Sequence, residues 1–286
     1  LGLEASDILP ASTGVIGAQL KMDLWEKAAP ALAANLGKAT PEDFARAIMT
    51  TDAFHKISHR EVSLPGGVVK LVGMAKGAGM ICPNMATMLS VVLCDAQVEA
   101  SVWQKMLRDA VELTFNRVTV DGDTSTNDTL YGLANGASGV SASDEESLKA
   151  LSAALTSVLG DLAYMLVKDG EGASKVARIH VTGAASDADA ERVARTVGHS
   201  QLVKTALYGR DANWGRIVAA VGRSGADFNP DDVVVTLCGV ELFRKGQPTD
   251  LDFDALLEEP LKQRDLSIDI VLGSGSGSYT LLASDL

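Results

Sequence analysis

The spacing of hydrophobic positions along the chain alternates between helical and strand-like stretches. Apolar residues recur at helical spacing in four stretches, at 22–36, 99–116, 143–168 and 187–198. Runs rich in Val, Leu and Ile predict strands at 67–72, 88–94, 175–182, 232–239, 266–272 and 278–283. The strand at 88–94 is nearly continuous in apolar residues, which is typical of a strand buried on both faces. The loose alternation of helices and strands predicts a mixed α/β class.

Local signals mark some of the boundaries. Thr40 followed by Pro41 and two acidic residues predicts a helix that begins there and runs to about Met49. Pro30 lies inside the first predicted helix and disturbs it. The alternating Gly and Ser residues at 273–278 lie between two predicted strands, and this pattern predicts a hairpin loop.

Composition and charge narrow the possible functions. The 286 residues carry 37 acidic and 25 basic side chains, a formal net charge of -12. Nucleic acids and anionic membranes select basic surfaces, so we expect neither as a partner. Three scattered cysteines indicate a reducing compartment, and no apolar run or leader pattern indicates a membrane span or export. We therefore expect a cytoplasmic protein.

Several motifs fail as cofactor or metal sites. No pair of cysteines has zinc-type spacing, and His55 and His59 have no acidic ligand at a zinc spacing. The glycines at 73, 77 and 79 match neither the Rossmann nor the Walker pattern. We expect no metal and no bound cofactor.

The segment at 73–95 carries the most informative chemistry. A glycine-rich loop is followed by a Pro-containing turn, and then Ala86-Thr87 leads directly into the predicted buried strand. A threonine is a poor nucleophile unless a base is near, and an N-terminal threonine can use its own α-amine, whose pKa is about 7.7–8. By itself the pattern favours a structural threonine over a nucleophile.

Six segments, in order, resemble the ornithine acetyltransferase family, also called the bifunctional glutamate N-acetyltransferases of arginine biosynthesis. They are STGVIG at 12–17, AIMTTD at 47–52, GMAKGAGMICPNMATMLSVVLCD at 73–95, VDGDTSTNDT at 120–129, KDGEGASK at 168–175 and LVKTALYGRDANWGRI at 202–217. Together they span nearly the whole chain. The resemblance implies a layered α-β-β-α sandwich of the self-cleaving type, with a C-terminal α/β lobe.

The resemblance also implies how the chain acts. The precursor cuts itself between Ala86 and Thr87, which gives an α-chain portion, 1–86, and a β-chain portion, 87–286. Thr87 is then the nucleophile that carries the acetyl group. Thr13, through its hydroxyl, and Gly14, through its backbone N–H, form the oxyanion hole. Such donors are typically worth about 10²–10³ in rate.

The substrates follow from the same resemblance. Thr50, Lys76 and Glu171, together with Thr87, match the family's substrate-binding positions. The implied reaction is ping-pong: N-acetylornithine gives its acetyl group to Thr87, and glutamate receives it. Some members also use acetyl-CoA as the donor. The two chains of each precursor are expected to assemble into a heterotetramer of two large and two small chains.

The chain departs from the family pattern at both ends. Family members carry further residues before the STG motif and a substrate-contacting tail after the position of Leu286, so we expect both portions to be incomplete here. Two alternatives remain open at this point. One is a related self-cleaving aminopeptidase or amidohydrolase, in which water accepts the acyl group. The other is an inactive, truncated binding subunit.

Overall fold

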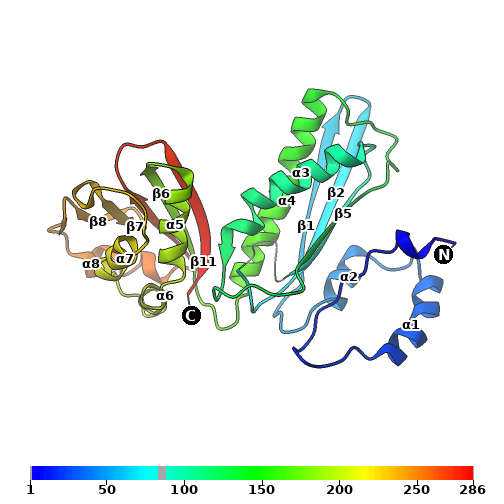
Figure 1. Cartoon of the computed structure of the whole chain (residues 1–286), viewed down its shortest axis with the longest axis horizontal. Coiled ribbons are helices and arrows are strands. Elements are labelled where there is room, and N and C mark those ends of the chain that lie inside the picture. Colours follow the sequence, from blue (N-terminus) through cyan, green and yellow to red (C-terminus); the bar gives the residue numbers. More distant parts are fainter. Residues whose placement is uncertain (1, 83–87, 286) are drawn as a thin grey trace.

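Two β-sheets with helices packed against them make up the fold (Figure 1). The structure is a computed structural model, and it describes residues 2–82 and 88–285. The first sheet has the strand order β1-β2-β3-β5: β1 (Lys56–Leu64), β2 (Gly67–Lys76), β3 (Leu89–Cys94) and β5 (Thr129–Ala134). The second has the order β4-β11-β6-β10-β7-β8-β9: β4 (Val118–Thr119), β11 (Gly277–Ser284), β6 (Val176–Ala184), β10 (Asp265–Val271), β7 (Val234–Leu237), β8 (Val240–Arg244) and β9 (Gln247–Pro248).

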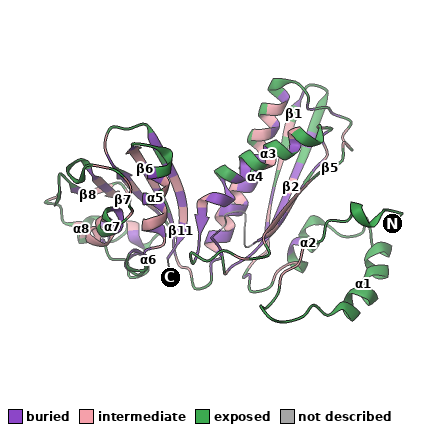
Figure 2. Cartoon of the chain, in the orientation of Figure 1, coloured by how far each residue is buried: buried purple, intermediate pink, exposed green. Residues whose placement is uncertain are grey.

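The helices fall into three groups. The N-terminal segment contains α1 (Met22–Ala34) and α2 (Pro41–Ala47), and Figure 2 shows that it is largely exposed. The first sheet is covered by α3 (Ala100–Leu113) and α4 (Glu145–Lys168). The C-terminal lobe contains α5 (Asp187–Gly198), α6 (Gln201–Tyr208), α7 (Trp214–Gly222) and α8 (Phe253–Leu257), with α5 packed on β6 and β11. Single 3₁₀ turns lie at Ala5–Asp7, Phe115–Arg117, Pro230–Asp232 and Pro260–Lys262.

Helix α4 is the core helix of the first lobe. Asp144 caps its N-terminus by accepting a hydrogen bond from the Ser147 N–H. Its length and apolar composition would also suit a membrane span. However, it packs against β1 and β2, and Leu155, Leu159 and Leu162 are fully buried there. The apolar character of α4 is therefore accounted for by the core.

The predicted mixed α/β class with a C-terminal α/β lobe is confirmed. The predicted helices at 22–36, 99–116, 143–168 and 187–198 each correspond to an observed helix, and Thr40 is the N-cap of α2. Strand β1 was missed because its sequence, KISHREVSL, alternates polar residues with few apolar ones. Strand β5 and the short helices α6 and α7 were missed as well.

The prediction of a hairpin loop at 273–278 is wrong. Strands β10 and β11 are not neighbours, because both pair with β6, one on each side. The Gly-Ser stretch therefore crosses the end of β6. It passes so close that a Cβ at Gly275 would lie 2.0 Å from the carbonyl oxygen of Ala184. Close backbone approach, not a tight turn, explains the glycines.

Gly73 offers a direct test of how tightly α4 packs on the sheet. A Cβ there would lie 2.6 Å from Cγ1 of Val158 and 2.9 Å from Cδ1 of Leu162. We expect Gly73→Ala to lower the free energy of unfolding by about 1–3 kcal/mol, measured by urea denaturation. Gly222→Ala is the control, because nothing lies within 4 Å of its Cβ position. Equal effects of the two substitutions would contradict this packing.

Candidate active site

The strand register gathers the candidate residues at one end of the first sheet. Lys76, at the end of β2, pairs with Leu89, at the start of β3, and Leu89 pairs in parallel with Thr129, at the start of β5. The Thr129 N–H also donates to the carbonyl of Met88 at 2.8 Å. Met88, the residues just before β5 and the residues just after β2 therefore meet at this end of the sheet.

A pocket of about 360 Å³ lies at this end. It is lined by Thr13, Gly14, Thr50, Lys76 and Met88. The loop at 123–128 completes it. A larger groove of about 760 Å³ lies between α3 and β5, but it is mostly apolar and lacks this convergence of polar groups. The smaller pocket is therefore the better candidate for chemistry.

The N-terminal segment contacts β5 and also contributes to the pocket wall. The Tyr131 hydroxyl donates a hydrogen bond to the carbonyl of Pro10 at 2.6 Å. This contact lies three residues before Thr13 and four before Gly14. Both predicted oxyanion-hole residues thus line the pocket.

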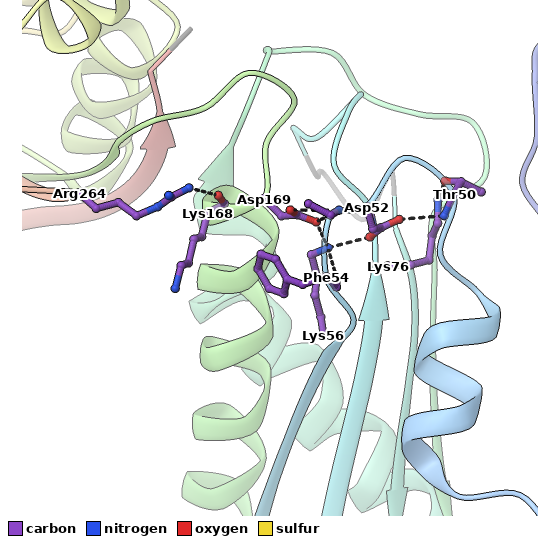
Figure 3. Close-up of polar contacts among 10 residues, drawn as sticks. Thr50, Asp52, Phe54, Lys56, Lys76, Lys168, Asp169 and Arg264 are labelled. Carbon is purple, nitrogen blue, oxygen red and sulfur yellow. Dashed lines mark hydrogen bonds and ion pairs between the residues drawn. The ribbon is translucent and has the colours of Figure 1, made fainter.

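Lys76 and Thr50 form a polar pair on the pocket wall. The Lys76 Nζ donates to the Thr50 Oγ1 at 2.7 Å (Figure 3). Burial lowers the pKa of Lys76, the negative charge of Asp52 opposes this shift, and the positive charge of Lys56 adds to it. The pair offers an ammonium group and a hydroxyl, which together suit a carboxylate.

Glu171 lies beside the pocket rather than in its wall. Its carboxylate atoms are 2.9–3.0 Å from where a Cβ of Gly79 would be, and Gly79 lines the pocket. The Glu171 N–H donates to the carbonyl of Ala78 at 2.8 Å. Glu171 is therefore attached to the same loop that follows Lys76.

The loop around the pocket is braced by Asp121. Its carboxylate accepts hydrogen bonds from the backbone N–H groups of Met80, at 2.6 Å, and of Ile81 and Asp123, both at 3.0 Å. Carboxylates that accept several backbone donors hold loops in one conformation. Asp121 thus joins the loop after β2 to the loop that precedes β5.

The predicted cleavage site, Ala86-Thr87, lies outside the described residues. Met88, the residue that follows it, lines the pocket. Of the predicted site residues, the structure brings together Thr13, Gly14, Thr50 and Lys76, with Glu171 beside them.

Comparison with known proteins places this site in a family. The model of the ArgJ family matches residues 1–286. The chain is 72% identical over 285 residues to the arginine biosynthesis bifunctional protein ArgJ of Nitratidesulfovibrio vulgaris; the match covers 100% of this chain and 72% of that protein. The chain belongs to the ArgJ family. It is also 46% identical to the ArgJ protein of Syntrophotalea carbinolica, over 100% of this chain and 73% of that protein.

A solved ArgJ structure has a similar fold. The crystal structure of the arginine biosynthesis bifunctional protein ArgJ from Bacillus halodurans aligns with a TM-score of 0.62 and 34% sequence identity. The alignment covers 67% of this chain and 91% of that one. The likeness therefore extends from sequence to fold.

The motif at 120–129 suggests no catalytic role for Asp128, and at most a bond that braces the loop, but Asp128 lines the pocket of this ArgJ-family chain. Both of its carboxylate oxygens are buried and have no hydrogen-bond partner among the described residues. Burial raises the pKa of Asp128 to about 7; the nearby Met88 N–H, which makes no hydrogen bond to it, favours the charged form and offsets part of that rise. The sequence places Asp128 in the family-like segment at 120–129. Its burial depends on the parallel pairing of β3 with β5, which the sequence does not reveal.

Asp128 makes the stability of the chain depend on pH. Its pKa is about 7 in the folded chain and about 4 in an unfolded one, so folding favours the protonated form and its ionisation destabilises the fold as pH rises from about 4 to about 7. We expect Asp128→Asn to raise the melting temperature at pH 8 by more than at pH 5. A substitution effect that is the same at both pH values would show that Asp128 does not titrate in this range.

Proposed function

We propose that this chain is an acetyltransferase of arginine biosynthesis that moves the acetyl group of N2-acetylornithine to glutamate. The observation that carries the proposal is the convergence of Thr13, Gly14, Thr50 and Lys76 at a pocket that is also lined by Leu89, at the start of β3. The relatives named above are arginine biosynthesis bifunctional proteins. Their sequences match this chain along its whole length, with 72% and 46% identity. The proposed setting is the cytoplasm.

Thr87 is the proposed nucleophile. After the bond between Ala86 and Thr87 is cut, its α-amine takes the hydroxyl proton as the Oγ attacks the acetyl carbonyl. Thr13 and Gly14 donate hydrogen bonds to the oxyanion of the tetrahedral intermediate. The C–N bond breaks, ornithine leaves with the proton, and an acetyl-threonine ester remains. The glutamate amine then attacks this ester, and the threonine α-amine takes the proton that the glutamate nitrogen loses. The C–O bond to threonine breaks, the α-amine passes that proton to the threonine oxygen, and N-acetylglutamate leaves.

The substrate-binding residues have complementary charges. Lys76 and Thr50 bind a carboxylate of the amino-acid substrates, and Glu171 attracts an ammonium group. Acetyl-CoA is a second proposed donor, because the named relatives are bifunctional. No step of the proposed reaction needs a metal or bound cofactor.

The proposed α and β portions, 1–86 and 87–286, share one sheet. β2 lies before the cut, β3 lies after it, and the two strands pair along the register from Leu71–Cys94 to Lys76–Leu89. Both portions would therefore remain associated after cleavage. We further propose that two such pairs form a heterotetramer.

Intact mass under denaturing conditions tests the cleavage. We expect two species of 86 and 286 - 86 = 200 residues, which stay together in native gel filtration. Thr87→Ala should give one uncut species, and Thr129→Ala, a change of another strand-start threonine, should be cut normally. A single species from the unchanged protein, or cleavage of Thr87→Ala, would refute Thr87 as the self-generated N-terminus.

The products distinguish transfer from hydrolysis. N-acetylornithine incubated with glutamate should give ornithine and N-acetylglutamate in equal amounts. Rapid release of free acetate in the absence of glutamate would instead support the amidohydrolase alternative. No turnover by correctly cleaved protein would support the binding-subunit alternative.

A further inference from the structure

A buried ionic cluster joins the segments that carry the proposed substrate-binding residues. The Lys56 Nζ is fully buried, and it lies 2.7 Å from Oδ1 of Asp52 and 2.6 Å from Oδ2 of Asp169 (Figure 3). Asp52 and Asp169 are also almost completely buried at their carboxylates. A single cation therefore bridges two carboxylates from distant parts of the chain.

Each carboxylate is also bonded to a backbone N–H of the pocket segments. Asp52 accepts from the Gly77 N–H at 2.6 Å and from the Thr50 N–H at 3.1 Å. Asp169 accepts from the Ala53 N–H at 3.1 Å. These bonds leave little freedom for the loops that follow α2, β2 and α4.

The cluster is adjacent in sequence to the proposed substrate-binding side chains among the described residues. Gly77 directly follows Lys76, and Asp52 lies two residues after Thr50 and accepts its N–H. Asp169 lies two residues before Glu171. The distances between Thr50, Lys76 and Glu171 are thus set by bonds that converge on Lys56.

Stability alone gives a weak reason for this arrangement. Burying one ammonium and two carboxylates carries a desolvation penalty that well-packed apolar side chains would avoid. Asp169 is also the C-cap of α4, where the helix dipole disfavours a negative charge. Buried ionic groups of this kind are best explained when they hold a geometry that the reaction needs.

We propose that Lys56 is a positioning residue, which bridges Asp52 and Asp169 and thereby holds Lys76, Thr50 and Glu171 at the spacing that fits an α-amino acid. The inference rests on the proposed function, since it assumes that these three side chains bind the substrate. Lys56 itself lies beneath the pocket and does not line it.

The charges of the cluster also act on Lys76. Asp52 raises the pKa of Lys76 and Lys56 lowers it, while burial lowers it most. The other charged groups near the pocket are Asp123 and Asp128 in its lining, Asp121 on the Met80 N–H, Glu171 beside Gly79, and Asp169 on Lys56. Removing the charge of Lys56 and removing the charge of Asp52 should therefore shift the pKa of Lys76 in opposite directions.

The direction follows from which charge is lost. In Lys56→Met the repulsion on Lys76 disappears. Asp52 stays ionised because two backbone N–H groups stabilise its charged form. The pKa of Lys76 then rises. In Asp52→Asn the attraction disappears and the repulsion remains, so the pKa falls.

The test compares pH profiles of kcat/KM for acetyl transfer. Both Lys56→Met and Asp52→Asn should lower kcat/KM by about 10- to 100-fold, mainly through KM. The alkaline limb should move to higher pH in Lys56→Met and to lower pH in Asp52→Asn, because Lys76 must keep its proton to bind a carboxylate. A purely structural role predicts similar losses without opposite shifts.

Arg60→Met is the matched control. Arg60 lies on β1, as Lys56 does, and it pairs at 2.6 Å with Asp161 of α4, the helix that Asp169 caps. The Arg60–Asp161 pair is partly exposed and lies farther along the strand from the pocket. We expect its kcat/KM to stay within about twofold and its alkaline limb to stay in place. Limb shifts of the same sign in Lys56→Met and Asp52→Asn, or none, would overturn the proposal.

Two further variants separate the possible failures. If Lys76→Met leaves KM unchanged, the proposed substrate-binding role fails; if Lys76→Met raises KM but Lys56→Met does not, only the positioning role fails. Should Lys56→Met not fold, the isosteric variants Asp52→Asn and Asp169→Asn keep the test. The alkaline limb of kcat/KM should move to lower pH by more in Asp52→Asn than in Asp169→Asn. Equal shifts in the two variants would contradict the proposal.

Discussion

The pairing of β3 on both sides is the constraint on which the site depends. β3 runs antiparallel to β2 and parallel to β5, so Lys76, Leu89 and Thr129 lie level with one another. A slip of one residue in either pairing would turn every side chain of the strand to the other face. The core beneath, where Gly73 lets α4 approach the sheet, keeps this register in place.

Charge is arranged around the pocket in two layers. The inner layer has one ammonium group on the wall, Lys76, and one buried carboxyl group without a partner among the described residues, Asp128. The outer layer is the fully paired cluster of Lys56, Asp52 and Asp169. Lys76, which bonds to the neutral Thr50 hydroxyl, and Asp128 are available to a ligand, whereas the ion-paired groups hold the loops. This division is what a site for a small zwitterionic substrate requires.

Much of this could be predicted from the sequence, for identifiable reasons. Helices with strong periodicity and clear caps, such as α4 and α5, have signals local to the chain. The motifs that carry Thr13, Thr50 and Lys76 were recognisable by resemblance, and the structure brings them to one pocket. The features that the sequence did not predict have weak local signals or depend on contacts between distant residues. Strand β1 is weakly apolar, the Gly-Ser crossing depends on β6, and the contact of Lys56 with Asp169 joins residues that nothing in the sequence pairs.

Whether Thr87 carries the acetyl group is tested most directly by the intact mass of the C-terminal chain after incubation with N-acetylornithine alone. This chain should gain the mass of one acetyl group, and fragmentation should place that group on Thr87. Adding glutamate should then return the chain to its original mass and release N-acetylglutamate. Ornithine release with no acetylated chain, or an acetyl group on any other residue, would show that Thr87 is not the acetyl carrier.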